Sequence, residues 1–140
     1  MERFLAEKQV DAKQLSPLTL AFIGDTVYDL LVREEIICYA NRSANDLHSL
    51  AVKQVRASAQ AKAIEDILGH LTEDEITVYK RGRNAHTTTV PKSASAGQYR
   101  RATGMEALFA YLYLEKRQDR MNELYEAAFG DVSTEISEPV

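Results

Sequence analysis

Two acidic residues lie in strongly apolar surroundings, where a carboxylate could do chemistry. Asp25 lies inside the run LTLAFIGDTVYDLLV, and Glu106 lies inside ATGMEALFAYLYL. Both runs have the periodicity of buried helices, and an aspartate in the middle of a helix does not serve as an N-cap. A buried ionised carboxylate is costly unless it is paired with a cation or bound to a metal. Asp25 and Glu106 are therefore the candidate catalytic residues.

A glycine lies close to each of these acids. Gly24 directly precedes Asp25, and Gly104 lies two residues before Glu106. Glycine inside a helix costs about 1 kcal/mol relative to alanine, and the close approach of another backbone is one reason to tolerate it. We expect the two helices to cross near Gly24 and Gly104, which would bring the two carboxylates to a common point.

Two converging carboxylates without a cluster of histidine or cysteine suit a hard divalent cation. Mg²⁺ typically binds one or two carboxylates together with water and phosphate oxygens. In one alternative, each acid pairs with a basic residue such as Arg33 or Arg101. In another, the acids form a metal-free pair for glycosidic chemistry, which needs a cleft lined for sugars. The chain has no tryptophan, which disfavours the second alternative.

A basic segment separates the two acidic helices, although the chain as a whole carries a net charge of −4. No Asp or Glu occurs between Ile76 and Met105. A local positive field inside an acidic protein indicates a surface that binds a polyanion, and a solvated basic face is the alternative. The candidate contact residues in this segment are Lys80, Arg81, Arg83, His86, Lys92, Arg100 and Arg101.

Helices must position these groups, because period-2 patterns are scarce and the chain has only three prolines. Residues 86–97 are expected to form a polar loop, and 131–140 a flexible tail. The expected fold class is all-α, with about six or seven helices in one domain over residues 1–130. Periodicity and capping signals predict helices over about 16–35, 43–55, 57–69, 72–83, 98–116 and 119–129.

Length and composition limit the class of protein further. A chain of 140 residues with 45% hydrophobic residues can form one packed domain. The single cysteine, Cys38, excludes a disulfide scaffold. No apolar run approaches the ~18 residues that would span a bilayer, and the N-terminal sequence has no signal-peptide core. We expect a soluble cytoplasmic protein without a membrane partner.

Four segments, taken together, resemble a known family. The run LAFIGDTVYD (20–29) resembles the signature helix of the ribonuclease III family, and TGMEALFAYLYLE (103–115) resembles its second acidic helix. The stretches NDLH (45–48) and KRGRNA (80–85) are more specifically similar to Mini-ribonuclease III, the bacterial subgroup that consists of the catalytic domain alone. The resemblance covers nearly the whole chain.

The resemblance implies a homodimeric, Mg²⁺-dependent endoribonuclease with the ribonuclease III-like fold. It would cleave double-stranded RNA and leave 5′-phosphate and 3′-hydroxyl ends, with precursor 23S ribosomal RNA as the subgroup's substrate. Asp25 and Glu106 would be the catalytic and metal-binding residues, the basic residues would contact RNA, and Phe22 would enter the partner subunit. Whether a large-subunit ribosomal protein is an accessory partner is left open. A non-catalytic helical RNA-binding protein and a helical protein–protein adaptor are the alternatives.

The sequence departs from the wider family at three positions where that family has acids. Thr103 lies three residues before Glu106, and Leu18 and Ala21 fall within the signature helix. We therefore do not expect a full set of four carboxylates, and the number of metal ions per site stays open. Phe22 also has a second interpretation, as an ordinary core residue.

Overall fold

The computed structural model describes residues 3–85 and 95–129, and all the regular elements in these ranges are helical. The all-α fold class predicted from the sequence is confirmed. The predicted tail, 131–140, lies outside the described residues. In chain order the elements are η1 (Ala12–Gln14), α1 (Pro17–Tyr39), α2 (Ala44–Val55), α3 (Ala57–Ile67), η2 (Leu68–His70), α4 (Glu73–Asn84), α5 (Ala96–Leu114) and α6 (Gln118–Phe129).

Side-chain caps determine where several of these helices begin. The side chains of Ser16, Ser43, Thr72 and Ser95 each accept a hydrogen bond from the backbone N–H three residues further on. In α4 and α5 the capping box is complete. Because of its cap, α5 begins earlier than predicted, and residues 96–97 are helical instead of forming the end of a loop.

Two further boundaries of the prediction can be compared with the structure. α1 continues four residues past its predicted end near Glu35, because the sequence that follows, IICY, contains neither glycine nor proline. The remainder of the predicted loop, residues 86–94, lies outside the described part of the chain. No helix in the described ranges is both long and apolar enough to span a lipid bilayer.

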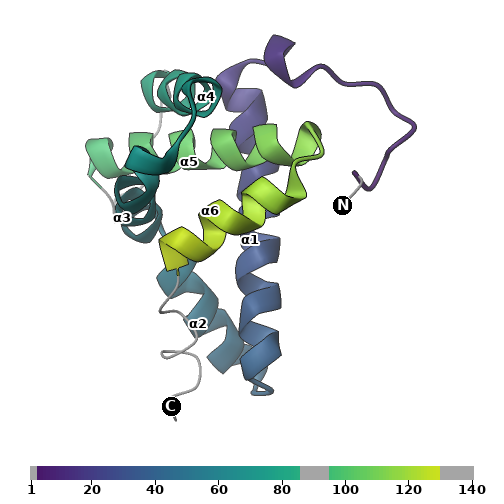
Figure 1. The fold of residues 1–140 in the computed structure, drawn as a ribbon. Coiled ribbons are helices and arrows are strands. Elements are labelled where there is room, and N and C mark those ends of the chain that lie inside the picture. Colours follow the sequence, from purple (N-terminus) through teal and green to yellow (C-terminus); the bar gives the residue numbers. More distant parts are fainter. Residues whose placement is uncertain (1–2, 86–94, 130–140) are drawn as a thin grey trace.

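α5 is the central helix of the fold. It packs against α1, α3, α4 and α6, and α1 crosses it before running on alongside α2 (Figure 1). Aromatic side chains fill the centre: the ring of Tyr28 meets the edges of Phe109 and Phe129, with centroid distances of 5.4 and 5.6 Å. α1 and α5, which carry the two acids, are the two longest helices of the described residues. The most extensive helix–helix packing is between these two.

α1 is not buried on all sides, contrary to the prediction from its apolar composition. Four large side chains, Leu18, Phe22, Leu30 and Ile37, are 41, 81, 47 and 64% exposed. They lie among the buried residues of α1 in sequence, but the single chain does not cover their side chains. The interpretation of Phe22 as a core residue is therefore wrong for the single chain.

A buried ion pair joins the start of α4 to α6. Glu75 is fully buried, and its two carboxylate oxygens accept hydrogen bonds from Nη2 and Nε of Arg120 at 2.8 and 2.9 Å. The backbone N–H of Thr72 donates to the same carboxylate at 2.9 Å. Burial opposes ionisation of Glu75, but these hydrogen bonds outweigh it and hold its pKa below the usual range. The pair fixes α6 against the end of the core.

Candidate functional site

The site begins where α1 crosses α5, because Gly24 lies directly against the backbone of Glu106. A Cβ atom added to Gly24 would lie 1.8 Å from the carbonyl oxygen of Glu106 and 2.5 Å from its carbonyl carbon. No side chain fits in that space, so glycine is required for the two helices to approach this closely. The predicted crossing of the two acidic helices is confirmed at Gly24.

Gly104 serves a different pair of helices. A Cβ atom added there would lie 2.6 Å from the ring of Tyr79 and 2.8 Å from the carbonyl oxygen of the same residue on α4. Gly82 faces it from α4, since a Cβ atom added to Gly82 would lie 2.9 Å from the Cα atom of Gly104. The prediction that Gly104 lies at the crossing with α1 is therefore wrong. Glycines thus allow α5 to lie close to both α1 and α4. The two contacts, at Glu106 and at Gly104, are less than one turn of α5 apart.

The crossing brings the carboxyl groups of Asp25 and Glu106 into contact. Glu106 is partly buried as predicted, whereas Asp25 is exposed, which corrects the prediction that it is buried. Burial, together with a hydrogen bond to Asp25 and repulsion by its charge, raises the pKa of Glu106 to about 8. A carboxyl group of Glu106 with this pKa is mostly protonated at neutral pH in the metal-free protein.

Neither of the two carboxyl groups forms an ion pair within the described ranges. Nε of Arg33 instead contacts the carboxylate of Asp29 at 3.0 Å, one turn away on the same helix. Nη1 of Arg101 contacts the carboxylate of Glu65 on α3 at 3.1 Å. The alternative in which these arginines neutralise the two site acids is therefore wrong.

A third polar side chain, Gln60 of α3, reaches the same place. It is 3% exposed, and its Nε2 donates to the backbone carbonyl of Val55 at 2.7 Å. Its amide also lies beside the carboxyl group of Glu106 and lowers the pKa of that group, against the larger effect of burial. Its Oε1 is buried without a hydrogen-bond partner. Gln60 was not predicted from the sequence, although a lone amide among small apolar residues in ASAQAKAIEDI is a detectable signal.

The donor set fits a divalent cation that takes few protein ligands. No group of three His, Cys, Asp or Glu gathers anywhere in residues 3–85 and 95–129. The site offers two carboxylates, which is a usual number for Mg²⁺, an ion that completes its shell with water and substrate phosphate. Of the positions where the wider family has acids, Leu18 and Ala21 are apolar, and the hydroxyl of Thr103 donates to the backbone carbonyl of Tyr99 at 3.0 Å.

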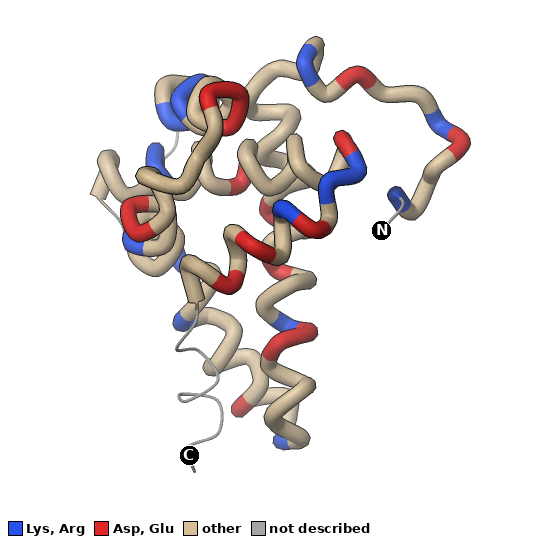
Figure 2. The backbone as a smooth tube through the Cα atoms, viewed as in Figure 1, with Lys and Arg blue, Asp and Glu red and all other residues tan. Residues whose placement is uncertain are grey.

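The predicted basic residues that the structure describes lie on two helices packed against each other. The close contact of Gly82 with Gly104 brings the last turns of α4 next to the first turns of α5. Figure 2 shows Lys and Arg gathered on α4 and near this end of α5. His86 and Lys92 lie outside the described residues. The described members are Lys80, Arg81 and Arg83 on α4, and Arg100 and Arg101 on α5.

These basic side chains differ in their exposure and in the contacts that they already make. Lys80 and Arg100 are exposed and form no ion pair with another described residue. The guanidinium of Arg83 lies over the ring of Tyr79, 5.6 Å from its centroid. Arg101 is occupied by its contact with α3, described above. Lys80 and Arg100 are therefore the most available for an anionic ligand.

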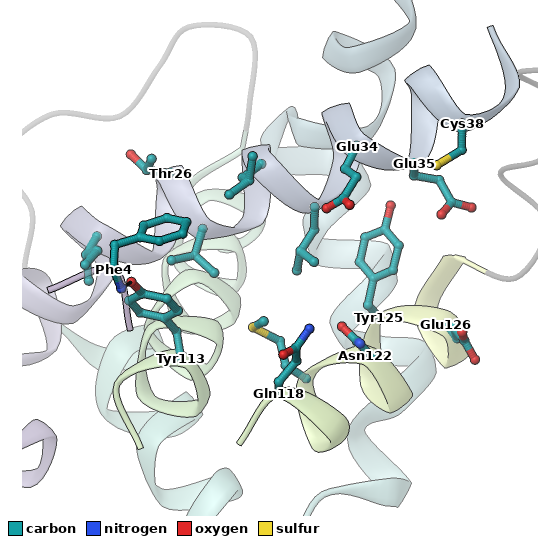
Figure 3. A pocket seen from close by; sticks show the side chains of 15 residues that line it. Phe4, Thr26, Glu34, Glu35, Cys38, Tyr113, Gln118, Asn122, Tyr125 and Glu126 are labelled. Atoms are coloured by element: carbon teal, nitrogen blue, oxygen red, sulfur yellow. Dashed lines mark hydrogen bonds between the residues drawn. The ribbon is translucent and has the colours of Figure 1, made fainter. Parts of the chain in front are cut away.

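A cavity of about 430 Å³ lies between the exposed face of α1 and α6 (Figure 3). Its walls include Ile23, Val27 and Leu30 of α1, and Tyr113 and Met121 lie opposite them. Neither of the two site acids lines this cavity. The cavity is therefore separate from the carboxylate site, and Phe22 does not line it, although Thr26 and Leu30, one and two turns further along α1, do.

Comparison with known proteins agrees with this architecture. The family model for the ribonuclease III domain matches residues 18–117. The chain is 46% identical over 112 residues to a Mini-ribonuclease 3 of Thermoanaerobacter sp. (strain X514), covering 80% of this chain and 79% of that protein. It is 43% identical over 124 residues to a Mini-ribonuclease 3 of Clostridium tetani, covering 86% and 82%.

A solved structure shows the same arrangement of helices. The crystal structure of a protein from Fusobacterium nucleatum matches with a TM-score of 0.78 and 25% identity, over 87% of this chain and 98% of that one. The matched family region includes both helices whose crossing joins Asp25 to Glu106. The chain therefore belongs to the ribonuclease III family of endoribonucleases and, within it, groups with the Mini-ribonuclease 3 proteins.

Proposed function

We propose that this protein is a Mg²⁺-dependent endonuclease for double-stranded RNA, with Asp25 and Glu106 as its catalytic residues. The observation that carries the proposal is the contact between these two carboxyl groups, neither of which has a basic partner in the described ranges. Such a pair concentrates negative charge that a divalent cation neutralises well. A non-catalytic RNA-binding protein or an adaptor would have no need of it.

The two acids have different parts in the proposed site. Asp25 is exposed and can be approached by a phosphate, whereas Glu106 is held by the backbone contact at Gly24 and by its hydrogen bonds. Both must be ionised to hold Mg²⁺, so the proton on Glu106 has to leave. Bound Mg²⁺ would supply an activated water and would stabilise the departing 3′ oxygen in an in-line displacement. No side-chain nucleophile is required.

The basic residues of α4 and α5 are proposed to contact the RNA. Duplex RNA is recognised mainly by its shape, through phosphates and 2′-hydroxyls across the minor groove. Exposure favours Lys80 and Arg100 as the principal contacts. His86 and Lys92 keep the role that the sequence suggests for them. Precursor 23S ribosomal RNA in the cytoplasm is proposed as the substrate, and this choice rests on the subgroup resemblance.

A homodimer is proposed because cleavage of both strands of a duplex needs two sites related by a two-fold axis. Phe22 is 81% exposed, and Thr26 and Leu30, one and two turns further along α1, line the 430 Å³ cavity. In a two-fold interface the same surface is present on both subunits. Phe22 of each subunit can therefore enter the cavity of the other, which would bury both apolar features at once.

The test of the proposed function uses a long RNA duplex incubated with the purified protein, with and without Mg²⁺. The wild type is expected to cleave only with Mg²⁺, and Asp25→Asn and Glu106→Gln are expected to bind the duplex without cleaving it. Asp29→Asn is the matched control, because Asp29 lies one turn from Asp25 but is paired with Arg33. Cleavage by Asp25→Asn at the wild-type rate would contradict the assignment.

A further inference from the structure

We propose that Gln60 is a positioning residue of the nuclease site, which holds the Glu106 carboxylate in place for a cation and leaves Oε1 beside it as a further acceptor. This inference rests on the proposed function of the same site. Gln60 comes from α3, whereas the two acids come from α1 and α5, so the site is assembled from three helices. Its position in α3 makes it one of three polar or charged residues that are buried within the described part of the chain.

The amide of Gln60 is anchored by backbone and not by another mobile side chain. The carbonyl of Val55 belongs to the last turn of α2, where carbonyl groups have no partner within the helix. Arg56 ends α2 and also precedes α3, and its side chain makes no capping hydrogen bond at the start of α3. Nε2 of Gln60 satisfies the Val55 carbonyl at 2.7 Å. The amide is therefore fixed at the junction of α2 and α3.

The partners of Gln60 determine which way its amide faces. A backbone carbonyl and an ionised carboxylate both only accept hydrogen bonds, and the amide has two N–H groups, both on Nε2. The hydrogen bond to Val55 uses one N–H of Gln60, and the other is available to the neighbouring carboxyl group of Glu106. A flipped amide would lose both contacts. A residue that only closed the junction between α2 and α3 would need one N–H, and the second is left for the carboxyl group of Glu106.

The unpartnered Oε1 atom points to the same role. A buried acceptor without a donor is unfavourable, and native structures rarely keep one without a reason. The neighbouring carboxyl groups are expected to hold a hydrated cation, whose water could donate to Oε1. Because the site has only two carboxylates, an amide from α3 is a natural third polar contributor. Residues that orient metal ligands typically affect metal affinity or activity by 10- to 100-fold.

The test replaces Gln60 with methionine, which keeps the length of the side chain and removes the amide. For Gln60→Met we expect kcat to fall on the order of tenfold and the Mg²⁺ concentration for half-maximal rate to rise by a similar factor. The KM for duplex RNA should stay within about twofold of wild type, since binding to the basic surface is unaffected. A thermal-shift titration with Mg²⁺ alone, without RNA, should show the same loss of affinity.

Two further variants keep the test decisive. Ile67→Val is the control for a loss of stability alone, because Ile67 lies in the same helix as Gln60, at a fully buried position away from the site. It should lower Tm without changing kcat or the response to Mg²⁺. If Gln60→Met folds poorly, Gln60→Asn retains an amide that is one methylene too short for both contacts and should show the same weakened response to Mg²⁺. A wild-type Mg²⁺ response in the folded Gln60 variants would overturn the inference.

The two proposals fail in different ways. Asp25→Asn is measured beside the Gln60 variants. If Asp25→Asn is inactive while Gln60→Met matches the wild type in rate and Mg²⁺ response, Gln60 is only structural and the proposed function stands. If Asp25→Asn cleaves as the wild type does, the proposed function itself is wrong.

Discussion

Substitution of Gly24 by alanine tests whether backbone contact between α1 and α5 sets the geometry of the site. The added Cβ atom would lie 1.8 Å from the carbonyl oxygen of Glu106, and real Cβ atoms do not come within 3.0 Å of such an atom. The helices would therefore have to separate by about 1.2 Å at their crossing. The position of the added Cβ atom is fixed by the main chain of α1, and the atoms that it meets are main chain of α5, so no side-chain rotation can relieve the clash.

The energetic effect has two opposing parts. Alanine in a helix gains about 1 kcal/mol over glycine. Overpacking a tight interface costs about 1–3 kcal/mol, and a contact between two backbones belongs at the upper end of that range. We expect Gly24→Ala to lower the free energy of unfolding by about 2 kcal/mol. Because a misplacement of about 1 Å can cost about 100-fold in rate, we expect cleavage of duplex RNA to fall by about that factor.

The measurements are urea denaturation followed by circular dichroism and a Mg²⁺-dependent cleavage assay at saturating duplex. Gly97→Ala is the matched control, because it lies in the first turn of α5 with no atom within 4 Å of the added Cβ and without a positive φ. The control should be unchanged or stabilised by about 0.4–1 kcal/mol, with full activity. If Gly24→Ala behaves like this control, the close crossing described for α1 and α5 is wrong.

Three other predictions concern charge and assembly. Since the folded state raises the pKa of Glu106 to about 8, Mg²⁺-free protein should lose stability as pH rises from the ordinary value of 4.5 towards 8 and then level off. Denaturation at several pH values should show this loss in the wild type and not in Glu106→Gln. Lys80→Ala and Arg100→Ala should each reduce the salt dependence of binding to a non-cleaved duplex by about one unit of slope, and wild-type affinity that does not change with salt would argue against the basic surface. Phe22→Ala should give a folded monomer in sedimentation experiments, because its ring is outside the core of the single chain; a dimer of wild-type strength would exclude Phe22 from the interface.

Helix boundaries were predictable where local chemistry determines them. Ser16 and Thr72 are caps whose hydrogen bonds involve only residues three positions away, so the sequence around each is sufficient. The end of α1 was less predictable, because no glycine or proline follows Glu35 and the helix continues until its C-cap at Ala40. The meeting of the two acidic helices was foreseen from Gly24, since a glycine inside a buried helix implies a close neighbour.

Other features of the site depend on long-range packing that spacing alone does not reveal. Periodicity marks an apolar face but does not say whether the same chain covers it, so it left Phe22 open between a core residue and a residue that enters a partner subunit, and only the fold shows that Phe22 is exposed on the single chain. A glycine near an acid does not say which helix it faces, and Gly104 proved to contact α4. Gln60 was overlooked because a helical glutamine is usually solvated, and only the fold places it against Glu106.

The glycine contacts on two sides of α5 have a consequence for how the molecule can vary. Gly24, Gly82 and Gly104 leave this helix no room to slide or roll against its neighbours. The spacing of the backbone positions that carry the two site carboxyls is thus set by contacts of the main chain. Substitutions on the outer surfaces of α4 and α6 can then change the surface charge and the recognition of ligands without changing the backbone spacing at these helix crossings.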